Sequence, residues 1–249
     1  MIVLMKCLNE VNMVPRVIGD FYKEPWVDRI IVIDGGSTDS TVHALKEFDK
    51  VEVFIHPWDF DYHDNEVSQS NIALSYVPAN NLAFILDFDE KMSPELKEVL
   101  AKIDEDGIPN NCDTAHFSRR SYELMRHEDS PFAIEDDDGW FLTSHSIGQY
   151  PDYQLRLIKK KVGMHWVNSP HHVMFGIGQF FPYQLFSTVS IDADIIHYHG
   201  KEDARQRVRI EKQWLRTKAR REELGLAPDC FECTTTPEMA KYGTKKGWK

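Results

Sequence analysis

The stretch Phe84-Ile85-Leu86-Asp87-Phe88-Asp89-Glu90 joins a short apolar run to a group of carboxylates. The apolar residues predict a strand that enters a core. Carboxylates gathered where that strand ends repel one another and lose hydration, and a cation that joins them reduces this cost. Such oxygen-rich sites suit Mg²⁺ or Mn²⁺, and ligands of open α/β sheets bind at the carboxyl ends of the strands. An Asp-x-Asp alone does not establish a metal site, so the rest of the sequence has to support it.

The composition is that of an acidic chain with enough apolar residues for a substantial core. Of its 249 residues, 42% are hydrophobic, which suffices for one large domain or two small ones. The net charge of -11 argues against general binding of nucleic acid. No apolar run approaches the roughly 20 residues of a membrane helix, and residues 1–7 are too short for a signal peptide. Four cysteines without dense spacing favour a reducing, cytoplasmic location.

Strands and helices alternate along the first hundred residues. We expect strands at 2–8, 29–34, 51–56 and 82–87, and helices at 13–22, 41–48, 66–76 and 94–103. This alternation is typical of an α/β fold with a mainly parallel central sheet flanked by helices. After residue 110 we expect strands at 114–120, 140–144, 154–159 and 189–196, then a charged helix at 202–224 and an irregular tail.

A second motif, Asp34-Gly-Gly-Ser-Thr-Asp39-Ser-Thr41, follows the second predicted strand and opens a helix. Its glycines permit a tight turn and let a ligand approach the backbone closely. Asp34 could accept a hydrogen bond from a base N–H or a ribose hydroxyl, and Asp39 or Ser40 could cap the helix. A plain turn between strand and helix is the alternative interpretation.

Taken together, these segments resemble family 2 glycosyltransferases of the GT-A fold. The resemblance is closest to the branch with an Asp-x-Asp-Glu motif, found among lipopolysaccharide and polysaccharide transferases. It is strong over residues 2–100, where it is carried by Leu8-Asn9-Glu10, the two motifs above and Asn71-Ile-Ala-Leu. It is weaker over 150–200, where the matching segments are Gln154-Leu-Arg156-Leu-Ile, Trp166 with His171-His172, and Ile195-Ile-His197-Tyr-His199.

The resemblance implies one GT-A-like domain over residues 1–249. Residues 1–110 would form the nucleotide-binding half, 111–200 the acceptor half, and 201–249 a helical C-terminal tail. The implied activity is metal-dependent transfer of a sugar, with inversion, from a UDP- or GDP-type nucleoside diphosphate sugar. The acceptor would be a hydroxyl of a glycan or lipid-linked glycan in polysaccharide biosynthesis.

The resemblance also assigns roles to individual residues. It implies a nucleotide-sugar site made by Asn9, Glu10, Asp34, Gly36, Asn71, Asp87 and Arg156. Asp89 would bind the divalent ion, with His197 as the best candidate for a second protein ligand. A neutral imidazole suits Mn²⁺, whereas Mg²⁺ prefers oxygen ligands. A partly buried histidine without a metal is the alternative for His197.

The chain departs from the family pattern at two positions. Gly35 stands where a second Asp is common, which puts one nucleotide contact in doubt. His172 stands where the family pattern has Glu, at the position of the base that takes the proton of the attacking hydroxyl. Histidine could do this near neutral pH, so His172 and Asp152 are the two candidate bases. The acidic run at 135–138 is better explained as a solvated loop.

The aromatic and basic segments do not decide which residues would bind the acceptor. Trp140, Trp166, Tyr150 and Tyr153 could line an acceptor groove, and the sequence offers no way to choose among them. The helix expected at 202–224 could rest on an anionic membrane or cover the sheet as a solvated helix. Three other functions remain open: a nucleotidyltransferase, a non-catalytic nucleotide- or glycan-binding module, and a metal-dependent hydrolase built on His197 and His199.

Overall fold

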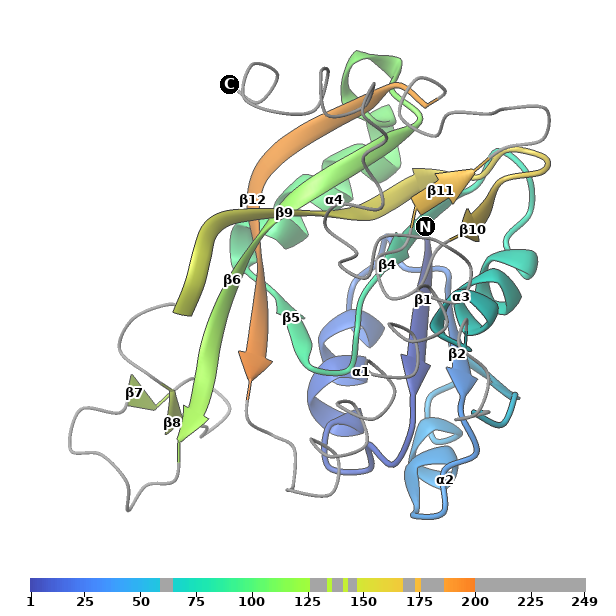
Figure 1. Ribbon diagram of the computed structural model, residues 1–249, viewed down its shortest axis with the longest axis vertical. Helices are drawn as coiled ribbons and strands as arrows, with labels where there is room; N and C mark the ends of the chain where they lie inside the picture. The colour runs from blue at the N-terminus through green and yellow to red at the C-terminus, as the bar shows by residue number, and fades with distance from the viewer. Residues whose placement is uncertain are drawn as a thin grey trace, which may run out of the picture.

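The computed structural model describes residues 1–58, 65–125, 134–135, 141–142, 147–167, 173–175 and 186–199. In this part of the chain, ten strands form one mixed sheet, and two more form a separate hairpin. Figure 1 shows the arrangement, with the N-terminal strands and helices at one end of the sheet and the long later strands at the other.

The first half of the sheet is parallel, as the alternation of elements predicts. Its strands are β1 (Ile2–Cys7), β2 (Arg29–Asp34), β3 (Val51–Ile55) and β4 (Leu82–Ile85). They pair in the order β3-β2-β1-β4. The helices are α1 (Val14–Tyr22), α2 (Thr41–Leu45), α3 (Asn65–Ser75) and α4 (Pro94–Asp106). Because these strands are parallel, the segments that follow β1, β2 and β4 meet at one edge of the sheet (Figure 1).

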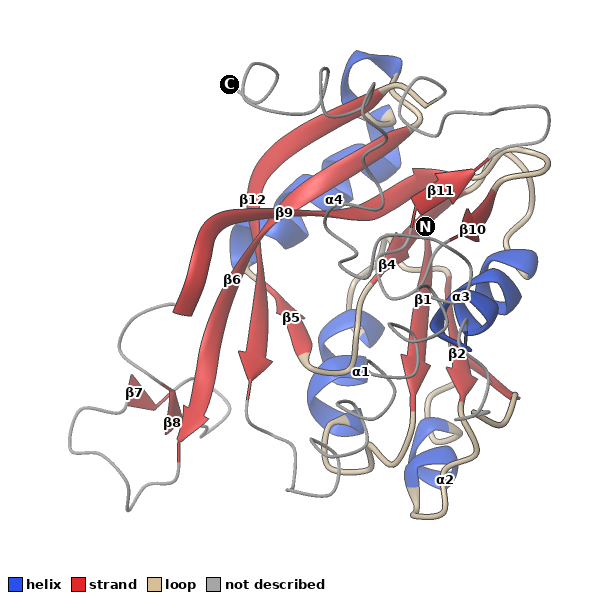
Figure 2. Cartoon of the chain, viewed as in Figure 1, coloured by secondary structure: helices blue, strands red, loops and turns tan. Residues whose placement is uncertain are grey.

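The second half of the sheet is mixed. It contains β5 (Glu90–Met92), β6 (Thr114–Met125), β9 (Ile147–Lys159) and β12 (Thr188–His199). Here β9 runs antiparallel to β4 and to β6, β12 is parallel to β6, and β5 is antiparallel to β12. The short strands are β7 (Ile134–Glu135) and β8 (Phe141–Leu142) beside β6, and the hairpin β10 (His165–Val167) and β11 (Val173–Phe175). In Figure 2 the long strands curve away from the parallel half, with α4 behind them.

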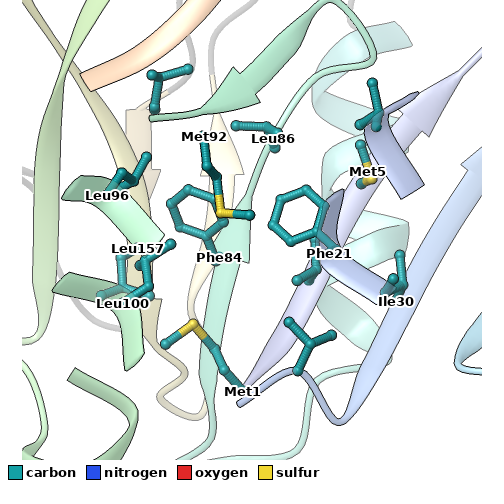
Figure 3. Packing of buried hydrophobic residues seen from close by; sticks show 14 of the residues in the cluster. Met1, Met5, Phe21, Ile30, Phe84, Leu86, Met92, Leu96, Leu100 and Leu157 are labelled. Carbon is teal, nitrogen blue, oxygen red and sulfur yellow. The ribbon is translucent and has the colours of Figure 1, made fainter. Parts of the chain in front are cut away.

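Two apolar cores lie on opposite faces of the sheet because strand side chains alternate. From β1, Val3 and Met5 join a core with α1 and α4, while Ile2 and Leu4 join a core with α3. In the larger core, Phe84 contacts Phe21 of α1 and Phe117 of β6, with ring centroids 6.1 and 5.9 Å apart. Figure 3 shows Phe84 beside Phe21 in this core, together with Leu96 and Leu100 of α4.

The helix ends follow the predictions unevenly. At the predicted start of α4, Ser93 caps the helix, because its Oγ accepts a hydrogen bond from Leu96 N at 3.2 Å. In contrast, α1 starts from Met13 without a side-chain cap, and α2 stops at Leu45, three residues before the predicted end. The charged helix and tail predicted at 201–249 lie outside the described residues. Within the described part, no helix is both long and apolar enough to cross a membrane.

Candidate active site

The loop between β4 and β5 carries Asp87 and Asp89, and it is held at both ends. Leu86 N donates to Leu4 O of β1 at 3.2 Å, and Glu90 N donates to Asp87 O at 3.1 Å. Tyr198 N of β12 donates to Asp89 O at 2.8 Å. These backbone bonds tie the loop to strands from both halves of the sheet. The Asp87 and Asp89 side chains are 38% and 27% exposed, so ligands can reach them.

The two predicted metal ligands come together although they lie far apart in the sequence. His197 Nε2 is 3.8 Å from Asp89 Oδ2, and two donors about 2.1 Å from one ion lie at most about 4.2 Å apart. On the other side of the ring, His197 Nδ1 lies 3.2 Å from Ser121 Oγ of β6. A hydrogen bond there orients the ring with Nε2 toward Asp89, as in metal sites whose histidines are held by outer partners.

The donor set is therefore compatible with a divalent ion, but it is small. In the part of the chain that the structure describes, no group of three or more His, Cys, Asp or Glu side chains could hold a metal ion. Asp89 and His197 would supply two ligands. The remaining positions would be left for water and ligand oxygens, which is how Mg²⁺-like ions bind substrate phosphates.

A buried charge network lies directly behind these two residues. Glu90 is only 1% exposed, and its Oε1 accepts a hydrogen bond from Arg156 Nη2 at 2.5 Å. Arg156 Nη1 also donates to Asp87 Oδ2 at 3.1 Å, and Glu90 Oε2 accepts from Asp87 N at 3.0 Å. Arg156 thus joins the exposed Asp87 to the buried Glu90, which fixes the conformation of the loop.

Burial and charge act in opposite directions on this network. Burial raises the pKa of Glu90, Arg156 opposes the change, and Asp87 and Asp89 add to it because they are like charges. Burial by itself lowers the pKa of Arg156, but Glu90 and Asp87 together raise it above its ordinary value. Arg156 stays charged, and it is the cation that makes three neighbouring carboxylates tolerable.

Asp152 lies at the outer side of the network. Arg119 donates to its Oδ2 from Nη2 at 2.6 Å and from Nε at 3.0 Å. Gln154 Nε2 donates to the other oxygen at 2.7 Å. Arg119 also approaches Glu90 Oε1 at 3.7 Å. Both oxygens of this predicted base are therefore engaged, while the other predicted base, His172, lies outside the described residues.

Asp34 builds the turn that follows β2. It is fully buried, and its Oδ1 accepts hydrogen bonds from Gly36 N at 2.9 Å and Ser37 N at 2.8 Å. Its Oδ2 accepts from Ser37 Oγ at 2.5 Å and from Cys7 Sγ at 3.3 Å. Gly36 has φ of 92°, which favours glycine. Asp34 therefore orders the turn, in which Thr38, Asp39 and Ser40 are exposed.

Asn9 and Glu10 tie the loop after β1 to the same turn. Asn9 Oδ1 accepts from Thr38 N at 2.8 Å, and Asn9 N donates to Ser37 Oγ at 2.8 Å. Glu10 N donates to Thr41 Oγ1 at 2.8 Å. Asn9 is exposed and has φ of 58°, a conformation that Asn tolerates better than most residues. The two loops form one ordered surface beside the Asp87 loop.

Gly35 is enclosed where many family members carry Asp. A Cβ at this position would lie 3.3 Å from Cys7 O and 3.4 Å from Trp58 Cβ. Gly35 N donates to the same Cys7 O at 2.8 Å, and Trp58 N donates to Gly35 O at 2.7 Å. A side chain at position 35 would therefore require the end of β1 or Trp58 to shift by a few tenths of an ångström.

Asn71 joins α3 to the strand β10. Its Nδ2 donates to Trp166 O at 3.0 Å, and its Oδ1 accepts from Trp166 N at 2.7 Å. This pair of bonds attaches β10 to α3. Nothing in this geometry directs the amide toward the Asp87 loop, so its contact with a nucleotide stays a prediction.

Sequence reasoning missed three parts of the site: the burial of Glu90, the role of Arg119, and the support of His197 by Ser121. Each depends on side chains that the pairing of β6, β9 and β12 brings together from distant parts of the chain.

Comparisons with known proteins agree on the fold. The model of glycosyl transferase family 2 matches residues 2–183. Among solved structures, the mannosyltransferase PcManGT from Pyrobaculum calidifontis in complex with GDP-Man and Mn²⁺ is 12% identical, with a TM-score of 0.51, over 89% of this chain and 64% of that one. TarS 1-349 from S. aureus is 14% identical, with a TM-score of 0.48, over 88% of this chain and 64% of that one.

Another match is glucosyl-3-phosphoglycerate synthase from Mycobacterium tuberculosis in complex with Mn²⁺, UDP and glucosyl-3-phosphoglycerate. It is 19% identical, with a TM-score of 0.35, over 48% of this chain and 43% of that one. The chain thus spans less than two thirds of the length of these structures. The family match covers most of the chain, and the mixed sheet with its flanking helices is that of the GT-A fold. The chain belongs to glycosyl transferase family 2.

Proposed function

We propose that the protein transfers a sugar from a UDP- or GDP-sugar to a hydroxyl of a glycan or lipid-linked glycan, in a divalent-metal-dependent and inverting reaction. One observation carries the proposal: Asp89 and His197 meet, with Oδ2 and Nε2 3.8 Å apart, at the carboxyl edge of the sheet. Family membership and the GDP-Man and Mn²⁺ in the structure of the similar PcManGT support it.

The donor would lie across the carboxyl ends of β1, β2 and β4. Asn9, Glu10 and Gly36 lie on the exposed loops that would receive the base and ribose, with Asp34 ordering the turn beneath them. Asp87 would contact the ribose or sugar. Arg156 would hold Asp87 in position and contribute positive charge, because it is already bonded to Asp87 and Glu90. In this scheme Asn71 acts at a distance by positioning β10.

Asp89 and His197 would hold Mn²⁺ or Mg²⁺. When bound, the ion would neutralise the leaving diphosphate. Ser121 would keep the His197 ring in one orientation. Imidazole as a ligand favours Mn²⁺ over Mg²⁺. Inversion would follow from direct attack by the acceptor hydroxyl on the face of the sugar opposite the diphosphate.

Two residues remain candidates for the base that takes the hydroxyl proton, His172 and Asp152. Asp152 is bonded to Arg119 and Gln154, so it would need to release one of these partners to accept a proton. This favours His172 as the base and Asp152 as a residue that positions Arg119 against Glu90. The cytoplasmic location, the membrane contact of the tail and the place in polysaccharide biosynthesis stay predictions from the sequence.

The test is release of nucleoside diphosphate from UDP- and GDP-sugars, with and without Mn²⁺, and with a mixture of neutral oligosaccharides as acceptors. We expect turnover that requires Mn²⁺, uses either the UDP-sugar or the GDP-sugar, and is accelerated by the acceptor. The turnover rate should fall at least about 100-fold in Asp89→Ala and in His197→Ala. Glu98→Ala, an exposed carboxylate on α4, serves as the control. Turnover that persists without metal or in Asp89→Ala contradicts the metal assignment, and the anomeric configuration of the product tests inversion.

Equal hydrolysis with and without acceptor would favour a hydrolase. Binding of nucleotide without any turnover would favour a binding module.

A further inference from the structure

Two strand irregularities lie beside β6, one opposite Arg120 and the other opposite Ser118. On one side, the β6–β9 register shifts between Arg119 and Ser121, so that several residues of β9 stand opposite Arg120. On the other side, the β6–β12 register shifts between Ile191 and Ile195. Bulges re-aim side chains and are frequent beside active sites. Here both bulges direct side chains toward the same guanidinium.

The residues of the two bulges are bonded to one another. Asp194 of β12 accepts from Arg120 Nε at 2.9 Å and from Tyr150 OH of β9 at 3.1 Å. Ser118 Oγ donates to the same carboxylate at 2.7 Å. The Arg120 guanidinium carbon lies 4.1 Å from the centre of the Tyr150 ring. One face of this ring therefore rests on Arg120, and its hydroxyl is held by Asp194.

Tyr150 is nevertheless 46% exposed. An aromatic ring that is fixed on one side and open on the other loses little conformational entropy when a ligand stacks on it. Exposed, rigid tyrosines are used in this way at recognition surfaces. Tyr150 is thus held in a fixed orientation for stacking, unlike an ordinary surface tyrosine, and we call it the stacking platform.

A second tyrosine and carboxylate extend the platform. Tyr153 OH donates to Asp192 of β12, and this hydrogen bond raises the pKa of Tyr153 to about 12. The described partner of Asp192 is thus a neutral phenol, whereas Arg120 offsets the charge of Asp194. Asp192 is exposed and retains acceptor capacity for further hydroxyl groups. The surface combines an aromatic face with a residual negative charge.

The platform and the candidate metal site share β6 but lie on opposite faces of the sheet, because Arg120 contacts Asp194 whereas the next residue, Ser121, contacts His197. Ser121, whose Oγ contacts His197, pairs across the sheet with Ile147 of β9. Tyr150 follows three residues later, and three residues of chain span no more than about 11 Å. A glycan that contacts both would therefore have to extend round the sheet.

We infer that Tyr150 and Tyr153, together with Asp192, form a subsite for a neutral sugar ring of the acceptor glycan. The inference rests on the proposed transferase function, of which it specifies the acceptor. The apolar face of the ring would stack on Tyr150, and its hydroxyls would donate to Asp192. Uronic acids and phosphorylated sugars would be rejected by the negative charge of Asp192.

The experiment is direct binding of the full-length protein to a glycan array that carries neutral and acidic glycans, followed by calorimetric titration with the best neutral oligosaccharide. We expect neutral glycans to be preferred. Tyr150→Ala should weaken binding at least about tenfold, or about 1.4 kcal/mol. Tyr150→Phe keeps the ring and should lose less. Asp192→Asn should raise the binding of acidic glycans relative to neutral ones.

Val162→Ala is the matched control, because Val162 is 82% exposed on the turn after β9. It should bind as the wild type does. Absence of binding, preference for acidic glycans, or unchanged binding in Tyr150→Ala would each overturn the subsite. Stabilisation of the wild type by nucleotide and Mn²⁺ is measured separately. If nucleotide and Mn²⁺ stabilise the protein but no glycan binds, the subsite is refuted and the transferase proposal stands. If glycan binds but nucleotide and Mn²⁺ do not stabilise the protein, the transferase proposal is refuted and the glycan-binding surface stands.

Discussion

Replacement of Arg156 by Met should reveal what the buried charge network contributes. The side chain of Arg156 is 10% exposed and that of Glu90 1% exposed, with Nη2 and Oε1 2.5 Å apart. Arg156→Met keeps much of the side-chain volume but leaves the Glu90 carboxylate without its closest cation. Removal of one partner of a buried ion pair costs about 3–5 kcal/mol, because the remaining charge is uncompensated. For a chain of this size, this corresponds to a fall in Tm of roughly 6–20 °C.

A second arginine of the same protein provides the matched control. Arg29 and Glu52 also form a two-point ion pair, at 2.6 and 2.8 Å, but their side chains are 37% and 42% exposed. Exposed pairs contribute about 0–1 kcal/mol, so Arg29→Met should cost no more than that. The free energies of unfolding are measured by urea denaturation at pH 7.5. A loss in Arg156→Met as small as that in Arg29→Met would refute the reasoning.

The pH dependence gives the same prediction an independent check. Burial already raises the pKa of Glu90 in the folded state, and loss of Arg156 should raise it further. A carboxyl whose folded pKa exceeds its unfolded pKa lowers stability above the folded pKa, and this penalty disappears as pH falls through it. The deficit of Arg156→Met should therefore be smaller at pH 5 than at pH 7.5. An equal deficit at both values would show that the cost does not come from the Glu90 charge.

Three further predictions use other parts of the structure. Gly35→Asp should lower the free energy of unfolding by about 1–3 kcal/mol because of the contact with Cys7 O. Gly19→Ala has open space on α1 and should raise it by about 0.5–1 kcal/mol. Urea denaturation measures both, and a Gly35→Asp variant more stable than Gly19→Ala would contradict this reasoning. Ser121→Ala should weaken Mn²⁺ binding in the presence of nucleotide by about 10–100-fold, measured by calorimetry, and unchanged affinity would exclude its positioning role. Burial lowers the pKa of His116 to about 4. As pH drops from about 6.5 to 4, the unfolded state therefore takes up a proton before the folded state does, and stability falls. In urea denaturation, the stability of His116→Asn should fall less steeply over this pH range, and an identical fall would assign the pH dependence to other groups.

Local sequence patterns predicted the parallel half of the fold. Val- and Ile-rich strands such as Arg29–Asp34 match the prediction residue for residue, because a strand buried on both faces must be apolar throughout. The Ser93–Pro94 helix start was also readable, since capping depends on neighbouring residues alone.

The missed elements depend on distant parts of the chain. Strand β5 is Glu-Lys-Met, which has no strand pattern and exists because it pairs with β12. The burial of Glu90 requires Arg156 from β9, and the orientation of His197 requires Ser121 from β6. In the described structure, Asp34 holds the turn after β2 and Asn71 is bonded to β10, and their contacts with a nucleotide stay predictions. Residue type and spacing indicated the region of the site, but long-range pairing decides which side chains face a ligand.

The most direct test of the central claim is thermal unfolding with UDP, GDP, CDP and dTDP, each with and without Mn²⁺, for the wild type, Asp89→Ala and His197→Ala. A ligand at about 100 times its Kd adds roughly 2.7 kcal/mol, which should raise Tm by about 5–10 °C. The account predicts a shift with one nucleotide that requires Mn²⁺ and disappears in both variants. No shift with any nucleotide, or an Mn²⁺-dependent shift that survives in both variants, would contradict a metal-assisted nucleotide site at Asp89 and His197.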